Sequence, residues 1–196
     1  GGARREPLRH PLGQQRPGHR TGGEGKDAAL SDSEVLVADL SDRAQTGKVA
    51  QRLADDARPV DLLVNNAGLA LAPEPAQKVA LEDWHTMIDT NITGLVNVTH
   101  ALLPTLIATG KGASIVNIGS VAGISSFGEQ AYAYGPSKAA LHQLSRLLAR
   151  ELVSEHINVN VIAPGRFPSK MTRFIAEDEA ALAADTAVIP MKRWGR

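Results

Sequence analysis

The amino-acid sequence predicts an α/β fold built on a doubly wound parallel sheet of the Rossmann-like type. Short β-branched runs alternate along the chain with longer segments in which apolar residues recur at helical spacing. Strands that alternate with helices favour parallel βαβ units over an antiparallel sheet. The length of 196 residues fits one domain with a substantial core.

The first predicted elements lie between residues 34 and 64. Residues 34–38 (EVLVA) form a short β-branched run, and Ser41 or Asp42 is placed to cap a helix that extends to about residue 57. Arg58 and Pro59 end that helix, because the residue before a proline disfavours helical geometry. The run VDLLV at 60–64 predicts a buried strand.

The later elements repeat the alternation. A long helical pattern runs from residue 81 to about 108, and SIVNI at 114–118 predicts the next strand. Residues 134–154 carry leucines at helical spacing. The run INVNVIA at 157–163 predicts a further strand, closed by Pro164 and Gly165.

The first thirty residues have a different composition. Gly, Arg, Pro and His make up 17 of them. Such a segment cannot bury enough apolar surface to offset the entropy of ordering it. We therefore expect a poorly ordered basic leader over residues 1–33, followed by a partial catalytic domain over 34–196. The arginines are scattered without aromatics, which argues against a nucleic-acid tail.

The overall composition excludes several classes of protein. Lys and Arg number 21 against 21 Asp and Glu, so no charge favours nucleic acid or an anionic membrane. Without cysteine the chain has no disulfide, thiol nucleophile or zinc–thiolate site, and no metal site is expected. No uninterrupted apolar run reaches about 18 residues. We expect a cytoplasmic protein with no nucleic-acid or membrane partner.

Small and polar residues follow the predicted strands at the edge where parallel sheets bind ligands. Asn65, Asn66, Ala67 and Gly68 follow the strand at 60–64. They would let the backbone lie close to a flat ligand, and the asparagine amides could pin neighbouring strands. The plain alternative is an ordinary turn.

A hydroxyl and a tyrosine–lysine pair follow further along. Ser120 stands just after the strand at 114–118, and most serines there only satisfy a turn. Tyr134 and Lys138 share one helix face at i and i+4. A lysine cation close to a phenol favours the phenolate, which suits acid–base catalysis, although an isolated pair of this kind is usually a surface pair.

The order of these motifs resembles the short-chain dehydrogenase/reductase family. Asn-Asn-Ala-Gly, then Asn91, then Ser120, then Tyr134 and Lys138 occur in the family's order, and the resemblance runs from about residue 35 to the C-terminus. It implies four catalytic residues, namely Asn91, Ser120, Tyr134 and Lys138. It implies a cofactor site made of Asp39, Leu40, Asn66, Ala67, Gly68, Tyr134, Lys138, Pro164, Gly165, Phe167 and Ser169.

The resemblance also implies a role for each catalytic residue. Tyr134 would be the general acid in carbonyl reduction, and Ser120 would hydrogen-bond the carbonyl oxygen. Lys138 would favour the phenolate and bind the nicotinamide ribose. Asn91 would hold, through its backbone, a water that passes protons to Lys138, and its plain alternative is an asparagine that bonds the main chain at a helix kink.

The region from residue 118 to 196 is similar to 3-oxoacyl-[acyl-carrier-protein] reductases. The similarity is carried by GEQAYAYGPSKAALHQLSR, EHINVNVIAPGRFPS and IPMKRWGR. It implies NADP(H) rather than NAD(H) as the cofactor, and reduction of the 3-keto group of an acyl chain. The substrate would be a small-molecule or acyl-carrier-bound carbonyl compound, and the protein would be a homodimer or homotetramer. Sugars or other secondary alcohols are the alternative substrates.

The sequence lacks parts of the family pattern at both ends. The Thr-Gly-x-x-x-Gly-x-Gly turn that holds the pyrophosphate is absent, since Thr21 and Gly22 are followed by Lys26 and Ala28 where glycines belong. Residues 7–30 match nothing in the family, and a weak match at 3–6 offers arginines for a 2′-phosphate. We therefore expect the first βα units and the last strand to be lacking. A catalytically inactive fragment is the alternative function.

The resemblance also places a lid near the C-terminus. Residues 172–187 are alanine-rich and helical, and Met171, Phe174 and Ile175 would face an acyl chain or else pack on the domain. His85 and His142 have no partner at metal-ligand spacing, so we interpret both as structural residues.

Overall fold

The computed structural model describes residues 33–56, 59–71, 76–110, 112–126 and 132–196. Its contacts divide the chain into two compact units, residues 1–35 and 36–196. The helices and strands below belong to the second unit. The predicted leader lies outside the described residues apart from residue 33, as do the arginines at 4 and 5.

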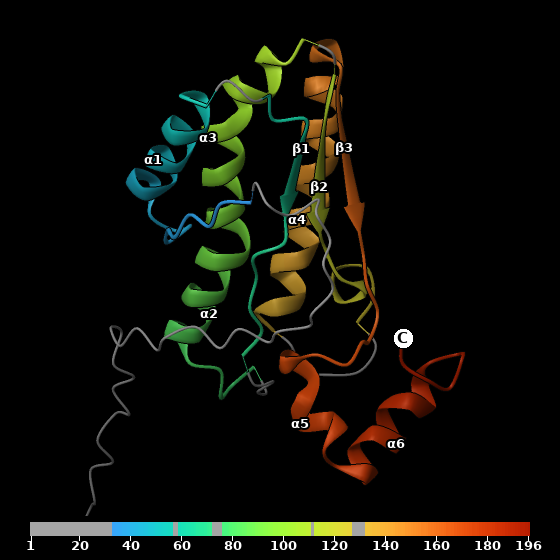
Figure 1. Cartoon of the computed structure of the whole chain (residues 1–196). Coiled ribbons are helices and arrows are strands. Elements are labelled where there is room, and N and C mark those ends of the chain that lie inside the picture. Colours follow the sequence, from blue (N-terminus) through green and yellow to red (C-terminus); the bar gives the residue numbers. More distant parts are fainter. Residues whose placement is uncertain (1–32, 57–58, 72–75, 111, 127–131) are drawn as a thin grey trace, which may run out of the picture. The chain divides into compact units, whose positions relative to one another are not determined.

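Three parallel strands form one sheet in the order β1–β2–β3 (Figure 1). The strands are β1 (Leu62–Asn65), β2 (Ala113–Ile118) and β3 (Ile157–Ile162). In the register, Leu63 lies opposite Ile115, and Ile115 lies opposite Val159. The prediction of a parallel sheet from 60–64, 114–118 and 157–163 is confirmed, with bounds displaced by one or two residues.

Helices join the strands and extend beyond β3. The α-helices are α1 (Arg43–Ala54), α2 (Leu81–Ile88), α3 (Gly94–Ala108), α4 (Tyr134–Glu151), α5 (Arg173–Ala176) and α6 (Glu179–Val188). The short turns are the π-helical η2 (Asp89–Thr93) and the 3₁₀ turns η3 (Val121–Gly123), η4 (Leu152–Glu155) and η5 (Lys170–Thr172). Asp42 caps α1, since its side chain accepts from the N–H groups of Ala44 and Gln45.

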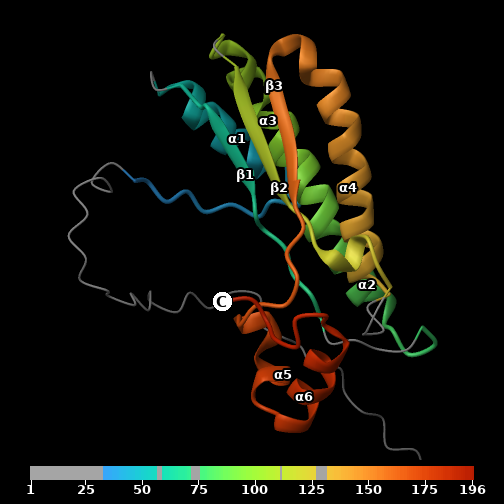
Figure 2. The same cartoon turned by 90° about the vertical axis from the view of Figure 1, so that its right-hand side faces the viewer.

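One face of the sheet is buried under helices. Alternate residues of β1 and β2, such as Leu63 and Ile115, are buried, whereas Leu62 and Val64 are exposed. Figure 2 shows α3 and α4 along that buried face, and α1 packs beside α3. The core cluster consists of Leu63, Leu102, Leu106, Ala113, Ile115, Leu152 and Ile157.

The predicted strand at 34–38 is wrong. These residues form no strand in the structure, and Val35 and Val37 are 86% and 93% exposed. A strand exists only where a neighbour accepts and donates its backbone hydrogen bonds, and the described part of the chain offers none there. The β-branched composition alone therefore misled the prediction.

The long helix predicted at 81–108 is interrupted around Asn91, the residue for which an asparagine at a helix kink was the plain alternative. The N–H of Gly94 donates to the carbonyl of Asp89, five residues back, so η2 is a π-turn between α2 and α3. The whole stretch is long and apolar enough to cross a membrane by length and composition. Its residues Leu102 and Leu106 belong to the core cluster, as expected of a core helix in a globular domain.

Candidate active site

Asn91 lies in the π-turn and joins two segments of the chain. It is 1% exposed, and its Oδ1 accepts from the N–H of Leu69 at 2.8 Å. Its Nδ2 donates to the carbonyl of Leu69 and to Oγ of Ser137, each at 3.0 Å. The amide therefore fastens the segment after β1 to the first turn of α4. This is the plain role foreseen for the residue, while its water-holding role stays a prediction.

Tyr134 and Lys138 lie together at the start of α4. The ammonium nitrogen of Lys138 is 5.8 Å from the centre of the Tyr134 ring. Lys138 is buried, and its Nζ donates to the carbonyl of Ile118, at the end of β2, at 2.8 Å. Burial lowers the pKa of this ammonium below its usual range. The lysine is therefore an interior cation rather than part of a surface pair.

The turn after β1 lies against the side chains of Asn91 and Lys138. A Cβ added to Gly68 would lie 3.2 Å from Oδ1 of Asn91 and 3.3 Å from Nζ of Lys138. Both separations are tighter than most real Cβ contacts, so glycine lets the turn approach these two side chains closely. The Asn-Asn-Ala-Gly segment therefore packs against the buried ammonium, and its contact with a cofactor stays a prediction.

Ser120 stands between β2 and η3 with its donor available. It is 8% exposed, and its Oγ accepts from the N–H of Ala122 at 3.1 Å. Among the described residues, no acceptor is found for its O–H proton. A hydroxyl held in this way can donate to a carbonyl oxygen of a bound molecule.

His142 was interpreted as a structural residue, and the structure adds a contact with Ser120 that the sequence analysis did not foresee. Its ring is buried behind Ser120, and its Nε2 accepts from the backbone N–H of Ser120 at 3.3 Å. The signal was present in the spacing, since His142 follows Lys138 by one turn on the inward face of α4. Metal spacing was the wrong criterion for this histidine.

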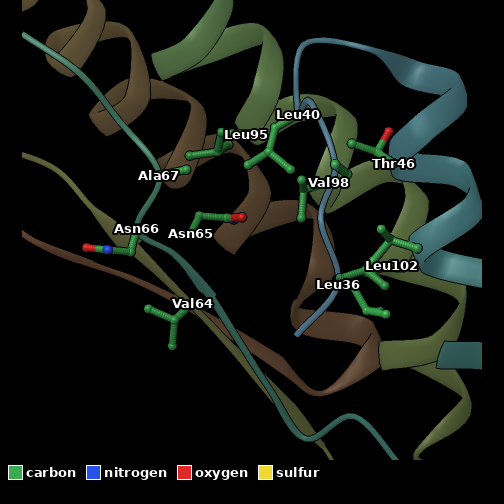
Figure 3. A pocket seen from close by; sticks show the side chains of 12 residues that line it. Leu36, Leu40, Thr46, Val64, Asn65, Asn66, Ala67, Leu95, Val98 and Leu102 are labelled. Atoms are coloured by element: carbon green, nitrogen blue, oxygen red, sulfur yellow. The ribbon is translucent and has the colours of Figure 1, made fainter. Parts of the chain in front are cut away.

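A pocket of about 330 Å³ opens beside β1 (Figure 3). In the figure, Leu40, Leu95 and Val98 point toward one another, and Asn66 and Ala67 line the pocket from the loop after β1. The lining is mainly apolar, and the volume lies within the range of small-molecule sites. The structure therefore brings three of the predicted cofactor residues, Leu40, Asn66 and Ala67, to one pocket.

Asp39 is occupied by local contacts. Its Oδ1 accepts from the N–H and the hydroxyl of Ser41 at 2.9 and 2.7 Å. Its own N–H donates to Oε1 of Gln45 at 2.9 Å. The carboxylate thus forms the turn that leads into α1, and contact with a cofactor base stays a prediction.

The loop after β3 begins beside Ser120 and leads into the C-terminal helices. The carbonyl of Pro164 accepts from the N–H of Val121 at 3.1 Å, which holds the start of the loop beside Ser120. Gly165, Phe167 and Ser169 are exposed. In Figure 1, α5 and α6 follow this loop beyond the carboxyl ends of the strands.

The segment predicted to be a lid is helical, as α5 and α6, and its action as a lid stays a prediction. Met171 and Phe174 are 41% and 56% exposed, so both could meet a ligand. Ile175 is only 5% exposed and packs inside, so it does not face an acyl chain.

The family model described as short chain dehydrogenase matches residues 16–180. The match includes the whole sheet and the helices from α1 to the first part of α6. It begins at residue 16, so the expectation that nothing in 7–30 matches the family is wrong for 16–30.

Curated relatives agree with the family model. The chain is 53% identical over 172 residues to the rhamnolipids biosynthesis 3-oxoacyl-[acyl-carrier-protein] reductase of Pseudomonas aeruginosa, covering 86% of this chain and 67% of that protein. It is 53% identical over 138 residues to sulfoacetaldehyde reductase 2 of Chromohalobacter salexigens, covering 70% of this chain and 54% of that protein. The chain thus spans between about half and two thirds of these relatives.

Solved structures share the fold. A Pseudomonas aeruginosa RhlG/NADP active-site complex matches with a TM-score of 0.79 and 53% identity, over 86% of this chain and 66% of that one. A gluconate 5-dehydrogenase from Beutenbergia cavernae, described as putative and NAD(P)-dependent, with bound NADP, matches with a TM-score of 0.75 and 35% identity, over 83% of this chain and 64% of that one. Because the family model matches most of its length, the chain belongs to the short-chain dehydrogenase/reductase family.

Proposed function

We propose that this chain is an NADP(H)-dependent oxidoreductase that reduces the 3-keto group of an acyl chain. The observation that carries the proposal is the convergence of Gly68, Asn91 and Lys138 around the first turn of α4. Tyr134 lies at the start of that helix, and the backbone of Ser120 is bonded to His142 on its next turn. The 3-oxoacyl substrate is suggested by the name of the relative at 53% identity. Sugars and other secondary alcohols remain the competing substrates.

The described residues fit the adenosine and the nicotinamide ribose of a dinucleotide, and none of them is assigned to its pyrophosphate. The pocket beside β1 is apolar and of suitable size for an adenosine, with Leu40 and the Asn66–Ala67 backbone as walls. Lys138 has three N–H donors, and the described residues supply one acceptor, the carbonyl of Ile118. The other donors suit ribose hydroxyls. When bound, the nicotinamide would supply the hydride for the reduction.

The chain's own residues would handle the carbonyl oxygen and its proton. The phenol of Tyr134 would give its proton to the oxygen as negative charge develops there. Ser120 would donate a second hydrogen bond to the same oxygen. The Lys138 cation would stabilise the phenolate that remains, and Asn91 would keep the first turn of α4 against the segment after β1.

The test combines cofactor binding with turnover. The purified chain is titrated with NADPH by calorimetry and then assayed with a 3-oxoacyl thioester, alongside a panel of sugars and secondary alcohols. We expect saturable NADPH binding and oxidation of NADPH with the thioester. Absence of binding at millimolar NADPH would instead establish the inactive-fragment alternative, and turnover of a sugar alone would replace the substrate class.

A pair of glycine variants makes the binding test specific. Gly68→Ala places a methyl group against Asn91 and Lys138, so it should weaken NADPH binding. Gly47→Ala on α1 has no atom within 4 Å of the new methyl group and should bind NADPH like the parent. Equal binding by both variants would show that the close approach of Gly68 to Asn91 and Lys138 does not matter for cofactor binding.

A further inference from the structure

His142 contacts the backbone of Ser120 from behind the site. The ring is 5% exposed on the inward face of α4, and its Nε2 accepts from the Ser120 N–H at 3.3 Å. Space for the ring comes from Gly119, because a Cβ there would lie 2.1 Å from Nε2 and 2.7 Å from Cδ2 of His142. The His142 ring therefore occupies the space that Gly119 leaves open and bonds the backbone of Ser120.

This contact defines the protonation state of the ring. Nε2 can accept a hydrogen bond only when it carries no proton, so the ring must be neutral with its proton on Nδ1. The charged groups facing His142 are Arg146 and Lys138, one turn to either side on α4, and both oppose a further positive charge. Burial, followed by these two cations, lowers the pKa of His142 below its usual range.

Ser120 is consequently fixed by two anchors. The backbone N–H is held by His142, while Oγ accepts from the N–H of Ala122 and caps η3. Protonation of His142 would turn its Nε2 from an acceptor into a donor that faces the Ser120 N–H. Two donors facing each other repel, so Ser120 and the turn that it caps would move.

We propose that neutral His142 is a positioning residue that holds Ser120 in place, and that protonation of His142 in acid releases Ser120. The inference rests on the proposed function, because it concerns the hydroxyl that would bind the substrate carbonyl. His142 itself touches neither substrate nor cofactor in this scheme. A purely structural histidine would fill the same volume without coupling its charge to Ser120.

Nuclear magnetic resonance tests the coupling without any substrate. In the ¹⁵N-labelled parent chain, the ring nitrogens of His142 should report the tautomer with the proton on Nδ1 at neutral pH. On acidification, the Ser120 amide resonance should shift with the same midpoint as the His142 ring. A ring protonated on Nε2, or a Ser120 amide that ignores the titration, overturns the inference.

Variants separate the hydrogen bond from packing. Gln at position 142 keeps an acceptor at about the place of Nε2 but does not titrate, whereas Leu fills the space without an acceptor. In His142→Gln, the Ser120 amide shift on acidification should vanish. In His142→Leu, the amide should already resonate away from its parent position at neutral pH. His85→Leu, at an exposed position on α2, is the matched control and should change neither property.

Activity gives the second readout. His142→Leu should lower kcat about 10- to 100-fold through misplacement of Ser120, with KM for NADPH unchanged. In His142→Gln, kcat should be close to the parental value. The fall of kcat at acidic pH that the parent shows should be absent from this variant. A parent chain without turnover would refute the proposed function alone, and the resonance experiment would still decide the role of His142. If His142→Leu keeps the parental kcat and the parental fall of kcat at acidic pH, the positioning role is refuted.

Discussion

The side-chain amide of Asn65 on β1 donates to the amide oxygen of Asn117 on β2 at 2.9 Å. Asn65 also donates to the hydroxyl of Thr99 on α3 at 3.1 Å, and Asn117 donates to the hydroxyl of Ser145 on α4 at 2.8 Å. A buried polar chain therefore links two helices through two strands. It confirms, for Asn65 at the end of β1, the prediction that an asparagine amide pins neighbouring strands.

Asn117→Ala should destabilise the fold. Asn117 is 0% exposed, and its removal leaves the Asn65 donor and the Ser145 hydroxyl short of a partner. Each orphaned buried group costs about 1–3 kcal/mol. We expect the midpoint of urea unfolding to fall clearly. Asn160→Ala, at an exposed position on β3, is the control and should unfold like the parent. Equal midpoints for the two variants would contradict this account.

The polar chain also shows where sequence reasoning succeeds. Strands and helices were predicted because their apolar periodicity is local, and the positions of Asn65 and Ser120 after strands follow from the topology of a parallel sheet. The predicted strand at 34–38 failed because pairing depends on a neighbour that composition does not reveal. The contact of His142 with Ser120 was not foreseen because it spans 22 residues and depends on the absence of a side chain at Gly119.

Tyr134→Phe should abolish carbonyl reduction while leaving stability unchanged. The substitution removes only the phenolic hydroxyl, which is the proton donor in the proposed function, and general acid catalysis contributes about 10²- to 10⁴-fold. NADPH oxidation with the preferred substrate measures the loss, and the urea midpoint measures the fold. Tyr132→Phe, two residues earlier at an exposed tyrosine, should keep parent activity. Turnover at the parent rate by Tyr134→Phe would refute the assignment.

Leu62→Lys should reduce self-association. Leu62 is 55% exposed on β1, and in the described part of the chain β1 pairs only with β2. An apolar strand edge is a template for pairing with another chain, and a lysine opposes that pairing. When both proteins are concentrated, the variant should scatter less light than the parent. Its free energy of unfolding should stay within about 0.5 kcal/mol of the parental value. Leu81→Lys, at a leucine exposed on α2, is the control and should scatter like the parent. If Leu62→Lys also scatters like the parent, the edge of β1 is not the site of self-association.

Lys138→Met should flatten the dependence of stability on alkaline pH. Burial lowers the pKa of Lys138, so the native state binds this proton less tightly than the unfolded chain does. Below the native pKa both states are charged and the burial penalty is complete. Between the native pKa and the usual lysine value the native state loses its proton first, so stability rises with pH.

Methionine has a similar length without a charge, so that rise should disappear in the variant. Urea midpoints measured from neutral to alkaline pH provide the comparison. Lys48→Met on α1, where the lysine is exposed, should retain the parental slope and corrects for other titrating groups. A parental slope in Lys138→Met would show that the buried ammonium is not its source.

Asp185→Ala should loosen the C-terminal helices. Asp185 on α6 accepts from the indole Nε1 of Trp194 at 2.8 Å and pairs with Nε of Arg166 at 3.3 Å. Trp194 is 8% exposed, and the N–H of Gly195 beside it donates to the carbonyl of Arg166 at 2.8 Å. The carboxylate therefore joins α6 to both the loop after β3 and the C-terminal segment. Its removal leaves a buried indole donor without a partner, at a cost of about 1–3 kcal/mol.

Trp194 fluorescence reports this change directly, provided that Trp84→Phe is present in every sample so that one tryptophan remains. The emission of Asp185→Ala should shift to the red as the indole becomes hydrated. Asp185→Asn should show a smaller shift, because its amide oxygen still accepts from the indole although the charge that pairs with Arg166 is lost. Glu179→Ala, at an exposed position on the same helix, should leave the emission unchanged. If Asp185→Ala emits at the parental wavelength, packing of the ring alone holds Trp194, and the carboxylate is not what joins α6 to the loop after β3.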